Sequence, residues 1–445
     1  MKLLGLQVEK LYGHYNYDNI IFNSDVTFIY GLNGCGKTTV LNITEAIITG
    51  QIYKLFNYDF CKIKLQYARK DKINDIFEIV IERDREIIKT TFNGKEHTIE
   101  KKNEANMERR GYDNSSRYYF TEYQFLSDIK NTFNYVYLPL NRSVAINDFD
   151  MEDNLLFYRG NRLFNMEDDF DETLGKDLAM RQVERLIKEN FSYINFNISK
   201  INDNFRNRIL QSLLDVNEYA DSKKVIDEIW KQIGDVSRIK EIKIAYIKIL
   251  NDLSLINKEE ENNFTKFFDE VYKYINDNKG KISGEEAIKI YEIVKIKKIV
   301  SLAEETEKKK AEIREPIEKF LMTMNEFINV GEEGKKIEIN SMGRVYFKTR
   351  FSENHINIQH LSSGEKQLLT FFANLIFKVK NNKSGIFVVD EPELSLHLSW
   401  QKIFIEKTLE INRNIQLIFA THAPEIIGSR REKMFKLEKK YVYKK

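Results

Sequence analysis

The sequence predicts an α/β fold with a mixed sheet and an antiparallel side sheet, into which a helical domain is inserted. Near the N-terminus, a strand-like run at Val26–Tyr30 leads through a glycine-rich turn into a helix-like run from Lys37 to about Thr49. Near the other end, short apolar runs at 385–389 and 415–419 are typical of buried parallel strands. Between about Asp171 and Asn329 the apolar residues recur at helical spacing instead.

The chain divides into three predicted segments. We expect residues 1–150 to form the N-terminal part of an α/β head, residues 151–330 an inserted helical domain, and residues 331–445 the C-terminal part of the head. The insertion has no sustained heptads of the kind that a long coiled-coil arm needs. The sequence therefore predicts a helical bundle or a short arm there.

Alternating runs predict the side sheet. Strand-like patterns occur at 77–81 and 90–92, and Asn93-Gly94 is typical of a tight hairpin turn. Two more strand-like runs follow the insertion, at 336–340 and 344–348. The pattern indicates a mainly antiparallel sheet beside the predicted buried strands.

Length and composition exclude several classes of protein. The 445 residues suffice for a complete α/β lobe plus a substantial insertion. Lys and Arg number 70 against 68 Asp and Glu, so the overall charge gives no general attraction to nucleic acid or membrane. A charge comes too early, at Glu9, for a signal peptide, and no run could span a bilayer, so we expect a cytoplasmic protein without a membrane partner. Two cysteines, Cys35 and Cys61, form neither a disulfide framework nor a CxxC metal site.

A phosphate-binding loop lies between the first predicted buried strand and its helix. Residues 31–38 have the sequence GLNGCGKT, which fits GxxxxGK[ST] in the required strand and helix context. In such a loop, backbone amides and the helix N-terminus surround a β-phosphate, Lys37 bridges phosphate oxygens and Thr38 binds magnesium. An ordinary glycine-rich turn is the structural alternative. The candidate residues for binding ATP are Asn33, Gly34, Cys35, Gly36, Lys37, Thr38 and Thr39.

Two carboxylates end a predicted buried strand. Residues 385–391 have the sequence GIFVVDE, which places Asp390 and Glu391 at the carboxyl edge of the sheet, where nucleotide sites lie. We expect Asp390 to hold Mg²⁺ and Glu391 to polarise the attacking water as general base. Taken alone, such a pair is more often a solvated strand end.

A third motif lies thirty residues upstream of the acid pair. Residues 361–367 have the sequence LSSGEKQ and are typical of a helix start with a serine cap and an acidic first turn. The segment also resembles the signature motif of the ABC ATPase superfamily, and it stands between the other two motifs as in that family. The resemblance implies that Ser362, Gly364 and Glu365 meet the γ-phosphate of ATP held by a second copy of the chain.

The run at 415–419 ends in ATHAP, which resembles the switch segment of the same superfamily. The resemblance implies that His422 contacts the γ-phosphate, whereas an isolated histidine is more often a polar strand end. The sequence EPELSLH at 391–397 departs from transporter ATPases, which have Asp where His397 stands, and resembles the RecF, SMC-like and OLD-type ATPases. This resemblance covers roughly residues 1–142 and 315–435. No glutamine is assigned to a Q-loop, for which Gln124 and residues 138–142 are the candidates.

The resemblance implies an ATPase that uses ATP and Mg²⁺ and joins head to head as a dimer or higher oligomer. OLD-type nucleases continue into a Toprim domain where this chain has only residues 433–445, so we expect no self-contained DNA cleavage. The chain thus resembles the ATPase subunits of anti-phage systems such as PARIS and Septu, which implies a separately encoded effector partner, a nuclease or toxin.

Two other functions are compatible with the sequence. One is a RecF-like or SMC-like ATPase in DNA repair, which would need a basic track for DNA, and the other is a transporter motor, which His397 and the insertion disfavour. Lysines on Glu-rich helices are most often a solvated face. The candidate DNA contacts are Lys295, Lys297, Lys298, Lys308, Lys309, Lys310, Arg430, Arg431 and Lys433.

Overall fold

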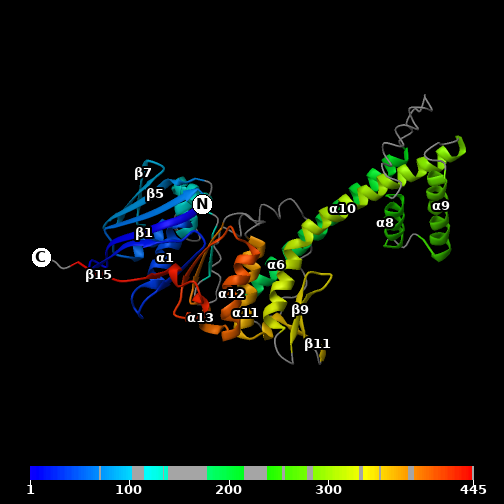
Figure 1. Cartoon of the computed structure of the whole chain (residues 1–445). Helices are drawn as coiled ribbons and strands as arrows, with labels where there is room; N and C mark the ends of the chain where they lie inside the picture. The colour runs from blue at the N-terminus through cyan, green and yellow to red at the C-terminus, as the bar shows by residue number, and fades with distance from the viewer. Residues whose placement is uncertain are drawn as a thin grey trace. The chain divides into compact units, whose positions relative to one another are not determined.

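The computed structural model describes residues 1–69, 72–102, 115–133, 135–138, 178–214, 238–252, 256–277, 284–329, 334–349, 352–378 and 385–442 (Figure 1). The chain divides into a head unit, Met1–Asn190 with Pro316–Lys445, and a helical unit, Phe191–Glu315. The predicted segment boundaries at residues 150 and 330 both fall outside the described residues.

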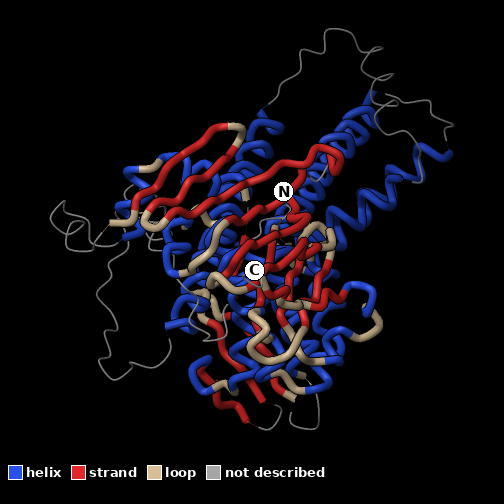
Figure 2. The backbone as a smooth tube through the Cα atoms, turned by 90° about the vertical axis from the view of Figure 1, so that its left-hand side faces the viewer, coloured by secondary structure: helices blue, strands red, loops and turns tan. Residues whose placement is uncertain are grey.

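An antiparallel sheet of seven strands forms one part of the head unit, and its strands are drawn in red in Figure 2. One face is buried, whereas the other bears cross-strand ion pairs such as Lys62 to Glu82 at 2.7 Å. Asn93 and Gly94 both have positive φ, which confirms the predicted hairpin turn. In spatial order the strands are β15 (Lys440–Tyr441), β2 (Tyr15–Ile21), β1 (Lys2–Leu11), β4 (Lys62–Arg69), β5 (Lys72–Asp84), β6 (Ile87–Phe92) and β7 (Lys95–Glu100).

A five-stranded parallel sheet forms the second part of the head unit. The predicted α/β class is confirmed, with the parallel and antiparallel strands in separate sheets. Its central strands are buried along their length, as their continuous apolar runs predict. In spatial order the strands are β14 (Met434–Lys436), β3 (Val26–Tyr30), β13 (Gln416–Ala420), β12 (Ile386–Asp390) and β8 (Tyr135–Leu138).

Helices cover both sheets of the head unit. The buried face of the antiparallel sheet shares one core with α1 (Lys37–Ile48), η1 (Ile52–Asn57), α3 (Ser115–Glu122) and α4 (Gln124–Thr132), where the rings of Tyr53 and Tyr119 stack at 4.6 Å. Phenylalanines join α11 (Ser363–Ala373) and α12 (Leu398–Ile411) to the parallel sheet, for example Phe404 with Phe419 of β13, whose ring centroids are 6.2 Å apart. A short π-helical turn (Asn374–Lys378) follows α11, and α13 (Pro424–Ile427) follows β13.

A small antiparallel sheet precedes α11. It consists of β9 (Lys335–Ile339), β10 (Val345–Thr349) and β11 (Ser352–Asn357), with β10 in the centre. The side chain of Glu338 receives hydrogen bonds from Lys348, Lys336 and Tyr346, which lower its pKa to about 2. Charge-assisted hydrogen bonds therefore link the strands of this sheet, which precedes α11 in the chain.

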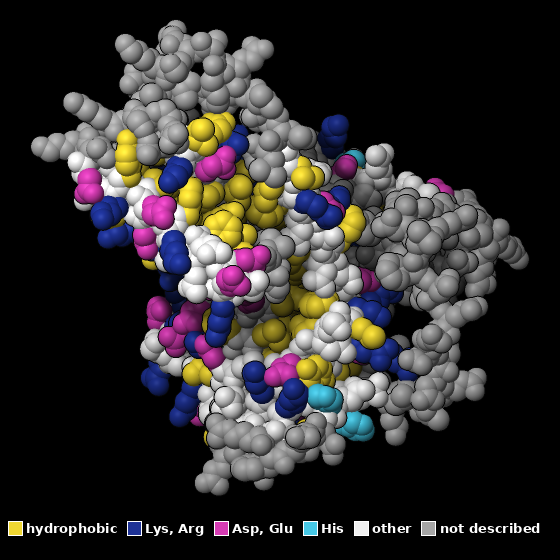
Figure 3. Space-filling view, turned by 90° about the vertical axis from the view of Figure 1, so that its right-hand side faces the viewer, with side chains coloured by type: hydrophobic (Ala, Val, Ile, Leu, Met, Phe, Trp, Pro, Cys, Tyr) yellow, Lys and Arg dark blue, Asp and Glu magenta, His cyan; other side chains and the backbone are white. Residues whose placement is uncertain are grey.

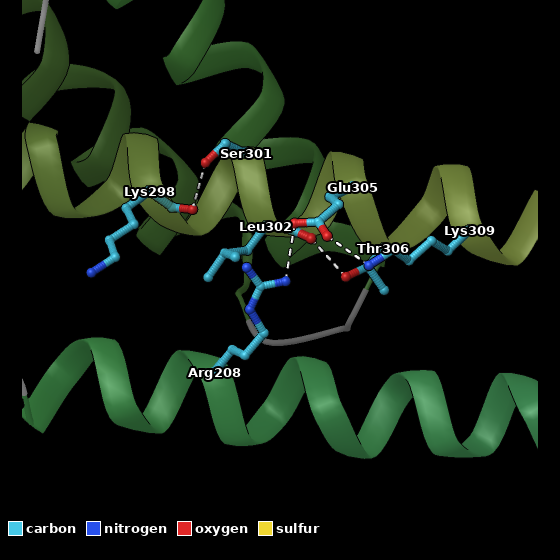
Figure 4. A network of polar contacts seen from close by, with 7 residues as sticks. All are labelled: Arg208, Lys298, Ser301, Leu302, Glu305, Thr306 and Lys309. Atoms are coloured by element: carbon cyan, nitrogen blue, oxygen red, sulfur yellow. Dashed lines mark hydrogen bonds and ion pairs between the residues drawn. The ribbon is translucent and has the colours of Figure 1, made fainter.

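The described helices of the insertion are α6 (Leu178–Leu214), α8 (Arg238–Asp252), α9 (Lys258–Asp277) and α10 (Gly284–Ile328). An apolar core joins α8, α9 and α10 through buried side chains such as Ile239, Phe268 and Ile293. Farther along α10, Glu305 accepts hydrogen bonds from Lys309 and from Arg208 of α6, which lies alongside (Figure 4).

The shared core of α8, α9 and α10 is compatible with the expected bundle, but two helices are longer than the expected short arm. α6 has 37 residues and α10 has 45, with Pro316 inside α10. Because a helix rises 1.5 Å per residue, they are about 55 and 68 Å long. Pairs spaced i,i+3 and i,i+4, such as Lys309 with Glu305, stabilise exposed helix without heptads, so the lack of heptads did not predict short helices.

Candidate functional site

Three strands of the parallel sheet end together at one edge. In the sheet register, Ile29 of β3 pairs with Ala420 of β13, and Ala420 pairs with Asp390 of β12. The phosphate loop follows β3, the acid pair ends β12, and the switch segment follows β13. The fold therefore brings three of the four predicted motifs to the carboxyl edge of one sheet, which is where open α/β sheets bind ligands.

Lys37 opens α1 and is buried at 7% exposure. Its ammonium nitrogen lies 3.2 Å from the carbonyl of Gly31 and 2.5 Å from Nε2 of His422. The phosphate loop and the switch segment thus converge on one point.

The loop conformation depends on its glycines and on a buried tyrosine. Gly36 has φ of 100°, and a Cβ there would lie 2.0 Å from the hydroxyl oxygen of Tyr17. That hydroxyl donates to the carbonyl of Cys35 at 2.5 Å, and burial raises the pKa of Tyr17, which keeps the phenol protonated. Only glycine fits at position 36, and the hydrogen bond from Tyr17 holds the backbone of the loop in place. No motif in the neighbourhood of Tyr17 predicts this role.

Asp390 has one oxygen satisfied and one available. Thr38 donates to Oδ2 of Asp390 at 2.8 Å, whereas Oδ1 is buried and has no hydrogen-bond partner among the described residues. Burial raises the pKa of Asp390, and the nearby charge of Glu391 adds to this, although the bond from Thr38 acts in the opposite direction. A divalent cation would satisfy Oδ1 and offset the cost of the buried charge. The pair of a hydroxyl and a carboxylate oxygen fits the hard ligands that Mg²⁺ prefers.

Glu391 holds an unusual backbone conformation. Its φ is 47° and its ψ is 59°, which is uncommon for a residue other than glycine, and its N–H donates to the carbonyl of Ala420 at 2.8 Å. Strained backbone of this kind concentrates at functional sites. Two residues later, Glu393 accepts the backbone N–H of His422 at 2.6 Å, a contact that sequence reasoning did not assign.

The predicted helix cap at the signature segment is confirmed. Ser362 caps α11, its side chain accepts from the N–H of Glu365 at 3.3 Å, and its own N–H donates to Glu365 at 2.8 Å. The other carboxylate oxygen of Glu365 accepts from Lys335 of β9 at 2.8 Å. Burial pushes the pKa of Glu365 up, but the bonds from Lys335 and Ser362 outweigh it and leave the pKa below its ordinary value.

The signature segment meets another motif at its end, where Gln367 donates to the carbonyl of Pro392 at 2.8 Å. Ser362 is exposed and Gly364 is buried, and the described hydrogen bonds that involve the side chains of Ser362 and Glu365 join them to each other and to Lys335. Of the remaining predicted residues, Asn33, Gly34 and Thr38 are exposed and Cys35, Gly36 and Thr39 are half-buried. Gln124 begins α4, while residues 139–142 lie outside the described residues. His397 caps α12 and accepts from the N–H of Ser399.

Four of the nine predicted basic candidates for DNA contact form ion pairs with acids among the described residues. On the face drawn in Figure 3, Lys and Arg side chains lie intermixed with Asp and Glu. Exposed pairs of this kind leave little net positive charge for a phosphate backbone. The described pairs are Lys295 with Glu292, Lys309 with Glu305, Lys310 with Glu307, and Lys433 with Asp25.

None of the helices in the described residues has both the length and the apolar composition needed to cross a bilayer. Likewise, no group of three or more His, Cys, Asp or Glu side chains in the described part of the chain could hold a metal unaided. A magnesium ion at Thr38 and Asp390 would therefore need ligands from a nucleotide and from water, as is usual for Mg²⁺ bound with phosphates.

Comparison with known proteins gives a family and several more distant likenesses. A family profile described as an AAA ATPase domain matches residues 1–427. The chain is 29% identical over 100 residues to the Retron Vc95 probable ATPase of Vibrio cholerae serotype O1 biovar El Tor, covering 20% of each protein. It is 34% identical over 80 residues to the Retron Ec83 probable ATPase of Escherichia coli, covering 16% of this chain and 15% of that one. These matches thus span a fifth or less of the relatives' length.

Among solved structures, the chain is similar to the Smc head domain of Pyrococcus furiosus with an extended coiled coil, solved bound to the C-terminal domain of ScpA. The identity is 12%, the TM-score is 0.40, and the alignment covers 99% of this chain and 96% of the other. A Smc head domain from Pyrococcus yayanosii gives 13% identity and a TM-score of 0.39 over the same shares of the two chains.

Proposed function

Because the chain belongs to the AAA ATPase domain family, we propose that it binds and hydrolyses ATP at the edge of the parallel sheet. The observation that supports this site is the convergence of two contacts, Thr38 with Asp390 and Lys37 with His422, between segments 352 and 385 positions apart. An ordinary glycine-rich turn would not be expected to contact both the acid pair and the switch segment at one edge of the sheet.

Each residue has a distinct proposed role. The loop amides and the N-terminus of α1 bind the β-phosphate, and Lys37 neutralises phosphate oxygens. Thr38 and Asp390 would hold Mg²⁺, which would neutralise phosphate charge. Glu391 orients and deprotonates the attacking water, and His422 donates to the γ-phosphate.

The proposed binding site is tested by replacing Lys37. Lys37→Ala should weaken ADP and ATP binding by on the order of a hundredfold, because a buried charge-assisted contact contributes about 3 kcal/mol. Isothermal titration calorimetry measures both affinities, and Lys402→Ala, an exposed lysine on α12, is the control. Equal nucleotide affinity in wild type and Lys37→Ala would reject the site.

We further propose that ATP joins two heads, each contributing its signature segment to the other's nucleotide. Three exposed leucines support this, since they adjoin the phosphate loop and the acid pair: Leu32 at 85%, Leu394 at 59% and Leu398 at 56% exposure. Single exposed leucines are common, but three in or shortly after these two motifs suit a surface that another chain covers. The exposed cap of α11 offers backbone amides to a phosphate in the same manner as other helix N-termini.

Light scattering tests the joining step. The Glu391→Gln protein should keep ATP unhydrolysed, so its mass should rise from 52.8 kDa to that of a dimer with ATP and Mg²⁺. Leu394→Ser should oppose this rise while leaving nucleotide affinity intact. A mass increase that requires duplex DNA instead would favour the DNA-repair function, and no increase under either condition would reject head-to-head joining.

The biological role that we propose is control of a separately encoded effector in anti-phage defence. It is supported by the names of two relatives, each a probable ATPase of a retron. ATP binding can gate a partner only if the partner prefers one nucleotide state. Purification of tagged wild-type and Glu391→Gln chains from the native host, followed by mass spectrometry, should recover a protein in a nucleotide-dependent manner. Recovery of the same proteins in both nucleotide states would contradict gating.

A further inference from the structure

Glu393 joins two segments of the site. It lies in η4 (Pro392–Ser395), directly after the acid pair, and its Oε1 accepts the backbone N–H of His422 at 2.6 Å. Its other oxygen, Oε2, is buried and has no hydrogen-bond partner among the described residues. The carboxylate is thus held against the switch backbone rather than directed to solvent.

Two glutamines fix the backbone on which Glu393 sits. Gln367 of α11 donates to the carbonyl of Pro392 at 2.8 Å. Gln401 of α12 donates to the carbonyl of Leu396 at 2.9 Å and to that of Glu393 at 3.4 Å. With both ends of η4 anchored to helices, Glu393 presents a fixed acceptor rather than a mobile side chain.

His422 needs such an acceptor because the sheet no longer supplies one. The N–H of Thr421 still donates to Ile29 of β3 at 3.2 Å, which continues the pairing of β13 with β3. At the next residue the backbone N–H turns to Glu393 instead, while the imidazole of the same residue reaches Lys37 at 2.5 Å. The bond to Glu393 therefore sets the backbone from which the imidazole is aimed.

We infer that Glu393 is a positioning residue that aims His422 at the γ-phosphate by holding its backbone N–H. The inference rests on the proposed ATPase function. Hydrogen bonds to an ionised acceptor are about twice as strong as neutral ones, which suits a bond at the exposed end of a strand. A glutamine at this position keeps an oxygen acceptor and loses the charge, so it separates positioning from a direct electrostatic role.

The test uses three variants of the full chain. Glu393→Ala removes the acceptor, Glu393→Gln keeps it, and Glu406→Ala changes an exposed glutamate on α12 as a matched control. Hydrogen exchange with mass spectrometry follows the His422 amide, and steady-state kinetics with ADP titration separates kcat from nucleotide affinity. Glu393→Ala should speed exchange at His422 and lower kcat on the order of tenfold with ADP affinity unchanged. Glu393→Gln should largely restore both.

Two outcomes would overturn the inference. One is an unchanged exchange rate of the His422 amide in Glu393→Ala, because the bond would then not restrain the switch backbone. The other is a Glu393→Gln protein that protects His422 and yet loses kcat as fully as Glu393→Ala, which would assign Glu393 a role through its charge. The exchange measurement needs no nucleotide, so it distinguishes failure of this inference from failure of the ATPase site, which Lys37→Ala reports.

Discussion

The ammonium nitrogen of Lys37 lies 2.5 Å from Nε2 of His422, across 385 positions of the sequence. In the proposed function, both groups contact the γ-phosphate. Lys37 stands on the rigid start of α1, whereas His422 stands on a loop held by a side-chain bond. The two residues should therefore differ in what their removal costs.

His422→Ala should reduce hydrolysis far more than binding. The imidazole contact matters when charge develops on the γ-phosphate, so kcat should fall on the order of a hundredfold while ADP affinity stays unchanged. Steady-state kinetics and calorimetry measure the two quantities, with the exposed His14→Ala as control. Parallel losses in kcat and ADP affinity would show that His422 acts in binding instead.

Tyr17→Phe should loosen the phosphate loop. The change removes the hydroxyl that donates to the Cys35 carbonyl and leaves the ring packing in place. Loss of one such bond costs about 1 kcal/mol, so nucleotide affinity should fall roughly fivefold. Tyr67→Phe, an equally buried tyrosine on β4, should leave the affinity unaltered. An unaffected affinity in Tyr17→Phe would mean that the glycines alone shape the loop.

Lys335→Met should impair head-to-head joining without impairing nucleotide binding. Lys335 supports Glu365, and Glu365 orients the cap of α11, so its loss should weaken ATP-driven dimerisation of Glu391→Gln on the order of tenfold. Analytical ultracentrifugation measures this, with Lys336→Met as control and Lys335→Arg as the conservative rescue. If Glu391→Gln dimerises equally well with and without Lys335→Met, the cap of α11 does not contribute to head-to-head joining.

The contribution of Glu365 to stability should depend on pH. Its pKa is lowered in the folded chain, so its charged form stabilises the fold above the ordinary pKa of about 4, and this stabilisation is lost as pH falls through the lowered value. The Tm of wild type should therefore exceed that of Glu365→Gln most at neutral pH, and the gap should narrow in acid. Thermal melts across the pH range measure the gap, and a gap that widens in acid would contradict the assigned direction.

Local patterns predicted the parts of the fold that are set locally. Val26–Tyr30 is a strand, Lys37 opens a helix, and Ser362 caps another, because burial pattern, glycine placement and capping act over a few residues. Local sequence patterns did not predict the strands β14 and β15 in the Lys-rich tail. Each pairs with a strand about 400 positions earlier, and no nearby residue indicates that partner.

In the candidate site, too, contiguous motifs could be predicted from the sequence and long-range contacts could not. The four motifs were recognisable because each is contiguous, and the sheet register accounts for the meeting of three of them. Tyr17, Lys335 and Glu393 were missed as supports, since each acts through a single bond to a residue 18 to 30 positions away. Long α6 and α10 were missed because exposed ion pairs replace the heptads that the prediction required.

Complementation between two inactive chains tests the central claim most directly. Lys37→Ala lacks a working phosphate loop and Ser362→Arg lacks a working signature segment, so each alone should hydrolyse almost no ATP. In a mixed dimer, the loop of the Ser362→Arg chain faces the intact signature segment of the Lys37→Ala chain and forms one complete site. We predict that mixing the two proteins restores ATP hydrolysis. A mixture that stays inactive, or Ser362→Arg protein that is fully active alone, would contradict a nucleotide site shared between two copies.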